Sequence, residues 1–76
     1  HEIEVDFYVP SSQLGIQVSY DMTNTDTRQR EISALLKLNS FKPLRRMIVI
    51  TYNEENTVVI DNHTIEIIPV WKWLLM

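Results

Sequence analysis

The chain has 76 residues, a formal net charge of -3 at neutral pH and no cysteine. This length fits one small domain, residues 1–76, in which folding buries only about 60% of the surface of the unfolded chain. The absence of cysteine excludes disulfides and thiolate zinc sites, no apolar run approaches the ~20 residues of a membrane span, and the acidic balance argues against a general nucleic-acid-binding protein.

The first predicted element is an antiparallel hairpin with strands over residues 2–9 and 14–20. A four-residue turn centred on its two serines places Asp6 opposite Gln17. Side chains alternate between the two faces of a strand, so the apolar residues of both strands share one face. The opposite, polar face is predicted to carry Glu4, Asp6, Gln17 and Ser19.

A helix is predicted next, over residues 27–38. Asp26 and Gln29 have the spacing of a capping box at its start, and Thr25 with Arg28 is a weaker alternative. An apolar stripe at i, i+3, i+4 and i+7 is formed by Ile32, Leu35, Leu36 and Asn39.

A buried strand and a second hairpin follow this helix. Residues 47–52 form a continuous apolar run, which is typical of a strand covered on both faces in a parallel pair. Residues 14–52 therefore read as a right-handed strand–helix–strand crossover. Strands over residues 57–60 and 64–68 form the second hairpin, with Asn62 the natural site for a positive φ in its turn.

The chain ends in a predicted short helix. Pro69 suits its first position, where a missing N–H costs nothing, and Trp71, Leu74 and Leu75 fall on one face that would cover the sheet. Trp71 and Trp73 are also candidates for an interface anchor, because tryptophan is favoured at binding hot spots. The predicted fold is α/β: a small mixed sheet built from a hairpin, a crossover helix, a buried central strand and a second hairpin, with a short C-terminal helix.

Basic residues are concentrated in the middle of the chain. Six of the seven Lys and Arg residues lie between positions 28 and 46. A basic helix surface is usually a solvated one, so contact with the phosphates of a nucleic acid is the less favoured interpretation.

Four segments, taken in order, resemble a single family. They are Glu4–Phe7, Ile16–Tyr20, Thr27–Glu31 and Ile68–Leu75. The family they resemble is the C-terminal domain that follows the AAA+ ATPase module in many bacterial and archaeal ATPases, whose end is similar to the PD-(D/E)XK, or restriction-endonuclease-like, fold. The resemblance covers essentially the whole chain. It implies a cytoplasmic C-terminal fragment of a longer ATPase, with ATP bound by an upstream module of the same polypeptide.

The nuclease pattern consists of a Glu on a preceding helix, an Asp at a strand, and (Asp/Glu)-x-Lys on the next strand. By this resemblance Asp6 matches the Asp, while Gln17 occupies the second carboxylate position and Ser19 the lysine position. A metal-dependent nuclease holds Mg²⁺ through carboxylate oxygens and needs a cation to stabilise developing charge. Gln17 offers only a neutral oxygen and Ser19 offers no charge. Arg28 or Lys42 would be the candidates for a migrated cation.

The resulting expectation is a non-catalytic accessory or regulatory domain of an AAA+ ATPase, with a degenerate site at Asp6, Gln17 and Ser19 and no cofactor of its own. One alternative is a metal-dependent nuclease in which Asp6 and residues from upstream bind Mg²⁺. Another is an assembly module whose exposed strand edge or tryptophan helix packs on a second subunit in a homo-oligomer. The upstream ATPase module is the expected partner; nucleic acid is weakly supported, and no membrane is expected.

Overall fold

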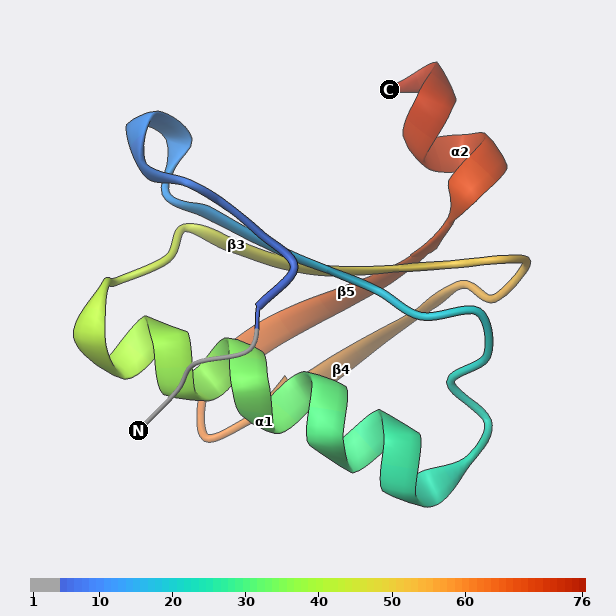
Figure 1. Ribbon diagram of the computed structural model, residues 1–76, viewed down its shortest axis with the longest axis horizontal. Helices are drawn as coiled ribbons and strands as arrows, with labels where there is room; N and C mark the ends of the chain where they lie inside the picture. The colour runs from blue at the N-terminus through green and yellow to red at the C-terminus, as the bar shows by residue number, and fades with distance from the viewer. Residues whose placement is uncertain (1–4) are drawn as a thin grey trace.

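The computed structural model describes residues 5–76, which form a five-stranded mixed sheet with one long and one short helix (Figure 1). The strand order is β1-β2-β3-β5-β4. The three inner strands run parallel to one another, and each edge strand runs antiparallel to its neighbour. The predicted α/β class, mixed sheet and short terminal helix are confirmed. The elements are β1 (Phe7–Val9), β2 (Leu14–Val18), α1 (Thr25–Phe41), β3 (Arg46–Thr51), β4 (Asn56–Ile60), β5 (His63–Pro69) and α2 (Val70–Leu75).

The first hairpin has the predicted register but a shorter first strand. Phe7 pairs with Ile16, and continuing this register places Asp6 opposite Gln17. β1 nevertheless begins at Phe7 and not at residue 2, so Val5 and Asp6 lie outside the strand. The prediction for residues 2–4 falls outside the described residues.

The second hairpin closes with a two-residue turn. Asp61 and Asn62 both have positive φ, 50° and 68°, as a type I′ turn requires. The positive φ predicted for Asn62 is confirmed, and Asp61 shares it. Asn and Asp tolerate this backbone region better than most residues because their short side chains bond locally.

Helix α1 is longer than predicted at both ends. Its N-cap is Asn24, whose Oδ1 accepts the backbone N–H of Thr27 over 3.0 Å. The predicted capping box at Asp26, and its alternative at Thr25, are therefore wrong. At the other end, Pro43 holds Lys42 in extended geometry with φ -128°, which stops the helix as the sequence indicated.

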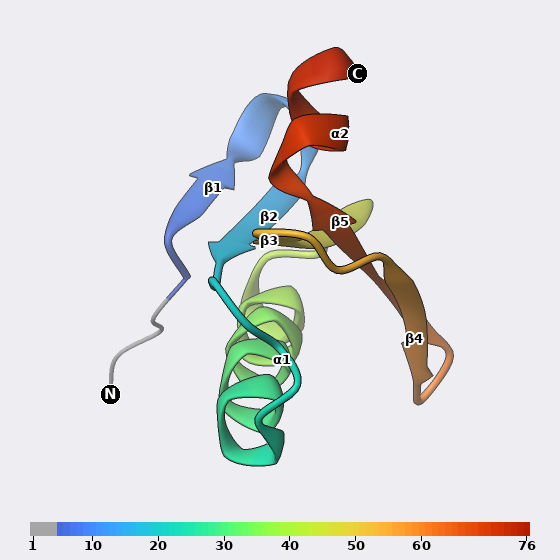
Figure 2. The ribbon, with the colours of Figure 1, turned by 90° about the vertical axis from the view of Figure 1, so that its right-hand side faces the viewer.

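The core lies on both faces of the sheet. Helix α1 covers one face (Figures 1 and 2), and strand β3 is buried on both faces, as predicted. The cluster beneath α1 consists of Met22, Ile32, Leu35, Met47, Val49, Ile65 and Ile67. The cluster on the opposite face consists of Ile16, Ile48, Ile50 and Ile68.

Helix α2 corrects two predictions. Pro69 is the last residue of β5 and the N-cap of α2, so the helix itself begins at Val70. Trp73 packs on the cluster opposite α1, whereas the predicted covering residues Trp71, Leu74 and Leu75 are 52%, 75% and 82% exposed. The reason is geometric: α2 rises away from the end of the sheet and does not lie across it (Figures 1 and 2).

Within residues 5–76, no helix has the length and apolar character needed to cross a membrane.

Candidate functional site

Asp6 and Gln17 are brought together by direct hydrogen bonds. The backbone N–H of Asp6 donates to Oε1 of Gln17 over 2.8 Å. Oδ2 of Asp6 accepts the backbone N–H of Val18, also over 2.8 Å. Because Val18 is the residue that the continued register would set opposite Val5, these two side chains replace main-chain pairing at the point where β1 stops. This explains why the strand is shorter than its apolar alternation predicted.

The face that carries Gln17 is not a solvent-facing polar face. Gln17 is only 1% exposed, and its parallel neighbour Val49 belongs to the cluster beneath α1. Gly15 lies on the same face, and it is closely covered there: a Cβ placed at this residue would lie 2.9 Å from Leu44 Cδ1 and 3.1 Å from Leu35 Cδ2. The face predicted to carry Asp6 and Gln17 is therefore the one on which α1 packs, so that Gln17 is buried while Asp6 is exposed.

Ser19, the third candidate residue, follows the end of β2. Its backbone N–H donates to the carbonyl of Ile50 over 2.9 Å. Its Oγ donates to the carbonyl of Asp21 over 3.4 Å. The hydroxyl is thus used by the loop that leads to α1, and it contributes no positive charge near Asp6.

The two candidates for a migrated cation lie at opposite ends of α1, and Arg28 already has a carboxylate partner. Arg28 lies in the first turn of α1 and forms an ion pair with Glu54, with 3.7 Å between Nη1 and Oε2. The Oε1 of Glu54 also accepts the backbone N–H of Met22 over 3.2 Å. Lys42 follows the other end of α1, so the length of the helix separates the two cations.

The donor set does not fit Mg²⁺. The ion prefers near-octahedral coordination by oxygen, whereas here one carboxylate already accepts the N–H of Val18, one amide oxygen accepts the N–H of Asp6, and the Ser19 hydroxyl bonds its own loop. Among residues 5–76, no three His, Asp or Glu side chains gather in a way that would hold a metal. Glu4, the remaining member of the predicted polar face, lies outside these residues.

Sequence reasoning missed an Asx turn in the loop after β2. Oδ1 of Asp21 accepts both the backbone N–H of Thr23 over 2.8 Å and the Thr23 hydroxyl over 2.6 Å. These bonds, the hydroxyl first, lower the pKa of Asp21 below its ordinary value because they favour the charged form. The Asp-x-Thr spacing was a readable signal for such a turn.

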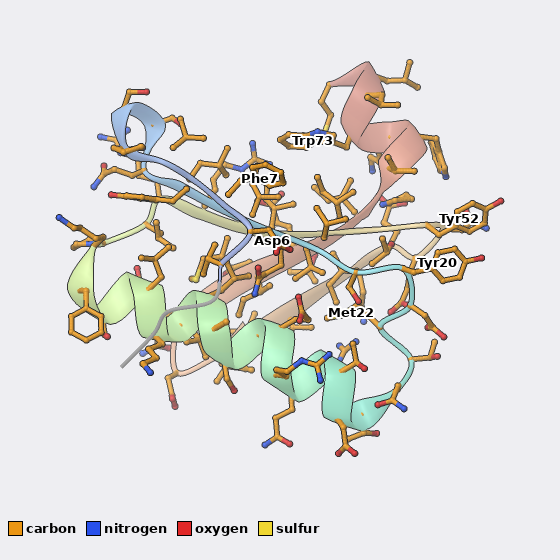
Figure 3. All side chains as sticks on the ribbon, viewed as in Figure 1. Asp6, Phe7, Tyr20, Met22, Tyr52 and Trp73 are labelled. Atoms are coloured by element: carbon orange, nitrogen blue, oxygen red, sulfur yellow. The ribbon has the colours of Figure 1, made fainter. Side chains whose placement is uncertain are left out.

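Two exposed tyrosines form another feature that the sequence did not reveal. Tyr20 and Tyr52 follow the carboxyl ends of β2 and β3, and their rings stack with centroids 5.1 Å apart (Figure 3). They line a shallow, mainly apolar cavity of about 280 Å³ together with Val18, Ser19, Ile50, Thr51 and Val70. Ligands of open α/β sheets commonly bind beyond the carboxyl ends of the strands. The polar side chains among these lining residues carry only hydroxyls, and those of Ser19 and Thr51 are hydrogen-bonded to carbonyls of the adjoining loops.

The comparisons with known proteins give one informative relative. The chain is 40% identical, over 81 aligned positions, to Uncharacterized protein MJ1544 of Methanocaldococcus jannaschii, and the alignment covers 95% of this chain and 18% of that protein. The chain therefore spans less than a fifth of the length of the curated relative that it matches. No protein-family model and no solved structure matches the chain.

Proposed function

We propose that this chain is a non-catalytic accessory or regulatory domain of an AAA+ ATPase and that it carries a degenerate nuclease-like site. The observation that carries the proposal is the use of the Asp6 carboxylate and the Gln17 amide as hydrogen-bonding groups of the first hairpin. The resemblance of four ordered segments to the C-terminal domains of such ATPases supplies the family.

The chemistry at these positions supports a structural role. Asp6 and Gln17 lie side by side, as the nuclease resemblance implies for the residues that match its two carboxylates. Gln17 is neutral and buried, and a carboxylate in that place would be costly to charge. Ser19 replaces the lysine that would stabilise developing negative charge. In our proposal these positions are therefore structural, and their polar groups stabilise the end of the hairpin.

The length of the relative supports an accessory role. The region that matches this chain makes up 18% of the M. jannaschii protein, so in that protein it accompanies a much longer polypeptide. In our proposal the longer part contains the ATPase module, which binds ATP and is the partner of this domain. A single glycine in the whole chain leaves no glycine-rich phosphate loop here.

The M. jannaschii protein allows a direct test. The complete protein and a version lacking the region that matches this chain are purified, and ATP hydrolysis is measured for both. We expect the complete protein to hydrolyse ATP and the shortened one to differ in its rate or in its dependence on ATP concentration. Absence of ATP hydrolysis by the complete protein, or identical kinetics of the two versions, would overturn the proposal.

A nuclease assay separates this proposal from the catalytic alternative. DNA is incubated with the protein in Mg²⁺ or Mn²⁺, for the unchanged sequence, for Asp6→Ala and for Asp26→Ala, a matched control in the first turn of α1. We expect no difference among the three. Cleavage that Asp6→Ala abolishes and Asp26→Ala leaves intact would replace our proposal with a metal-dependent nuclease.

A further inference from the structure

We propose that two copies of this chain pair through the outer edge of strand β4, in antiparallel register about a two-fold axis at Val58. The two five-stranded sheets would then join into one continuous sheet of ten strands. The inference is independent of the proposed ATPase association, because it rests on the edge strand and the groove beside it.

Strand β4 is an unprotected sheet edge. It pairs with β5 on one side, it is the last strand in the sheet order, and no helix or strand of residues 5–76 lies along its outer side (Figure 2). Natural proteins usually protect such edges with lysine, proline, a bulge or a very short strand. β4 has none of these devices, since its five residues are Asn56, Thr57, Val58, Val59 and Ile60.

The opposite edge of the sheet is protected. β1 has only three residues, Asp6 ends its pairing on one side, and Pro10 begins a turn on the other. The contrast between the two edges argues against an accidental lack of protection at β4. Because only the β4 edge is available for pairing, two copies that join through it form a closed dimer and not an open-ended fibre.

The backbone geometry of β4 defines the register. Ile60 and His63 flank a two-residue turn, so they exchange hydrogen bonds, and alternation leaves the N–H and C=O groups of Thr57 and Val59 directed outward. The N–H of Thr57 bonds the side-chain Oδ1 of Asn56 over 2.8 Å, which agrees with an outward direction. A two-fold axis at Val58 sets Thr57 of one copy opposite Val59 of the other. The N–H of Thr57 then exchanges the Asn56 oxygen for the carbonyl of Val59, and the other three outward groups gain partners.

The side chains are self-complementary in this register. Val58 meets Val58 of the second copy on the α1 face, and Thr57 meets Val59 on the other face, where Val59 is 66% exposed. No charged residue lies within the strand. Beyond its ends, Asp61 of one copy would face Glu55 of the other, and Lys72 already forms an ion pair with Glu55. A cation is therefore present where two carboxylates approach.

A groove beside the β4 edge also supports pairing with a second copy of the chain. A cavity of about 510 Å³ separates α1 from β4. Its apolar lining is formed by Ile32 and Leu36 of the helix and by Val58 and Ile60 of the strand, and polar helix residues complete it: Thr25, Arg28, Gln29 and Ser33. The proposed axis is perpendicular to the sheet, so both α1 helices lie on the same side and both grooves open toward the seam. Leu36, Val58 and Ile60 are half-buried in the single chain, and their further burial adds to the hydrogen bonds of the edge. Stable complexes usually bury about 800 Å² per partner, and a seam this short predicts a weak, concentration-dependent dimer.

Single-cysteine variants test the register. The chain has no cysteine, so any disulfide formed by Val58→Cys or Val59→Cys must join two molecules. Directly opposed residues bring their Cβ atoms within disulfide reach, whereas diagonal neighbours lie about 7–8 Å apart. Under mild oxidation we expect Val58→Cys to form a covalent dimer at least tenfold faster than Val59→Cys. Equal rates, or faster cross-linking at position 59, would overturn the register.

Sedimentation equilibrium tests the dimer itself. We expect the average mass of the unchanged chain to rise from monomer to dimer with concentration and to stop there. Val59→Lys should weaken association at least tenfold, and Val18→Lys, a 53% exposed valine on the same sheet face but away from β4, should leave it unchanged. Circular dichroism establishes that both variants are folded. A monomer at all concentrations, growth beyond the dimer, or equal effects of the two lysines would overturn the proposal.

Discussion

The backbone N–H of Asp6 donates to the side-chain oxygen of Gln17 over 2.8 Å, across the end of the first hairpin. The carboxylate of Asp6 in turn accepts the N–H of Val18. Two side chains therefore complete the pairing that the main chain of β1 leaves unfinished. Asp6, the residue that matches the nuclease aspartate by resemblance, therefore has structural partners. We expect its substitution to lower the stability of the fold.

Asp6→Ala is expected to lower the free energy of unfolding by about 1 kcal/mol, because the N–H of Val18 loses its acceptor. Asp6→Asn retains an oxygen at the same place and should cost clearly less. Urea denaturation followed by circular dichroism measures both changes. Equal losses for the two variants would show that the charge of Asp6, and not its hydrogen bond, matters to the fold.

Gly15→Ala is expected to destabilise the protein by about 1–3 kcal/mol through overpacking. The added methyl would lie 2.9 Å from Leu44, in the loop after α1, and 3.1 Å from Leu35, on the buried face of α1. Leu44→Ala removes the nearer neighbour, so the double variant should be more stable than the sum of the two single losses implies. If the losses of the two single variants simply add in the double variant, the added methyl is not strained against Leu44.

Trp73→Ala and Trp71→Ala should differ sharply. Trp73 packs against the isoleucines on the face opposite α1 (Figure 3), so its truncation should cost about 2–4 kcal/mol. Trp71 is 52% exposed, and its Nε1 donates to Oδ1 of Asn53 over 3.2 Å, so its loss should cost about 1 kcal/mol or less. Thermal unfolding of the two variants gives the comparison, and a reversed order would contradict the described packing of α2.

Thr23→Val should raise the pKa of Asp21 toward its ordinary value of 3.8, because the hydroxyl that favours the charged carboxylate is removed. Since this pKa is lowered in the folded protein, the associated stability is present above the ordinary pKa and is lost as the pH falls through the lowered one. The variant should therefore be less stable than the parent at neutral pH, with the difference closing in acid. An NMR titration of the Asp21 carboxyl carbon measures the shift, and an unchanged pKa would contradict the role of the hydroxyl.

The sequence predicted those features that depend on alternation and local turn chemistry. The period of two placed Asp6 opposite Gln17, and the uninterrupted apolar run placed β3 between two covered faces. Asn62 followed from the backbone region that its turn requires. Each of these is decided by residues close together in the chain.

Features that depend on distant contacts could not be predicted. Asn24, Thr25 and Asp26 all suit an N-cap, and the path of the chain into α1 selects Asn24. Arg28 pairs with Glu54, which β3 brings close. The burial of Gln17 depends on which sheet face α1 covers. That choice is not encoded in the hairpin itself.

The most direct test of the account asks whether Mg²⁺ binds at Asp6. A ligand that binds the folded state raises the stability of that state, so urea midpoints are compared with and without Mg²⁺ for the unchanged chain and for Asp6→Ala. The account predicts that Mg²⁺ shifts both midpoints by the same small amount. A saturable stabilisation of the unchanged chain that Asp6→Ala removes would contradict it.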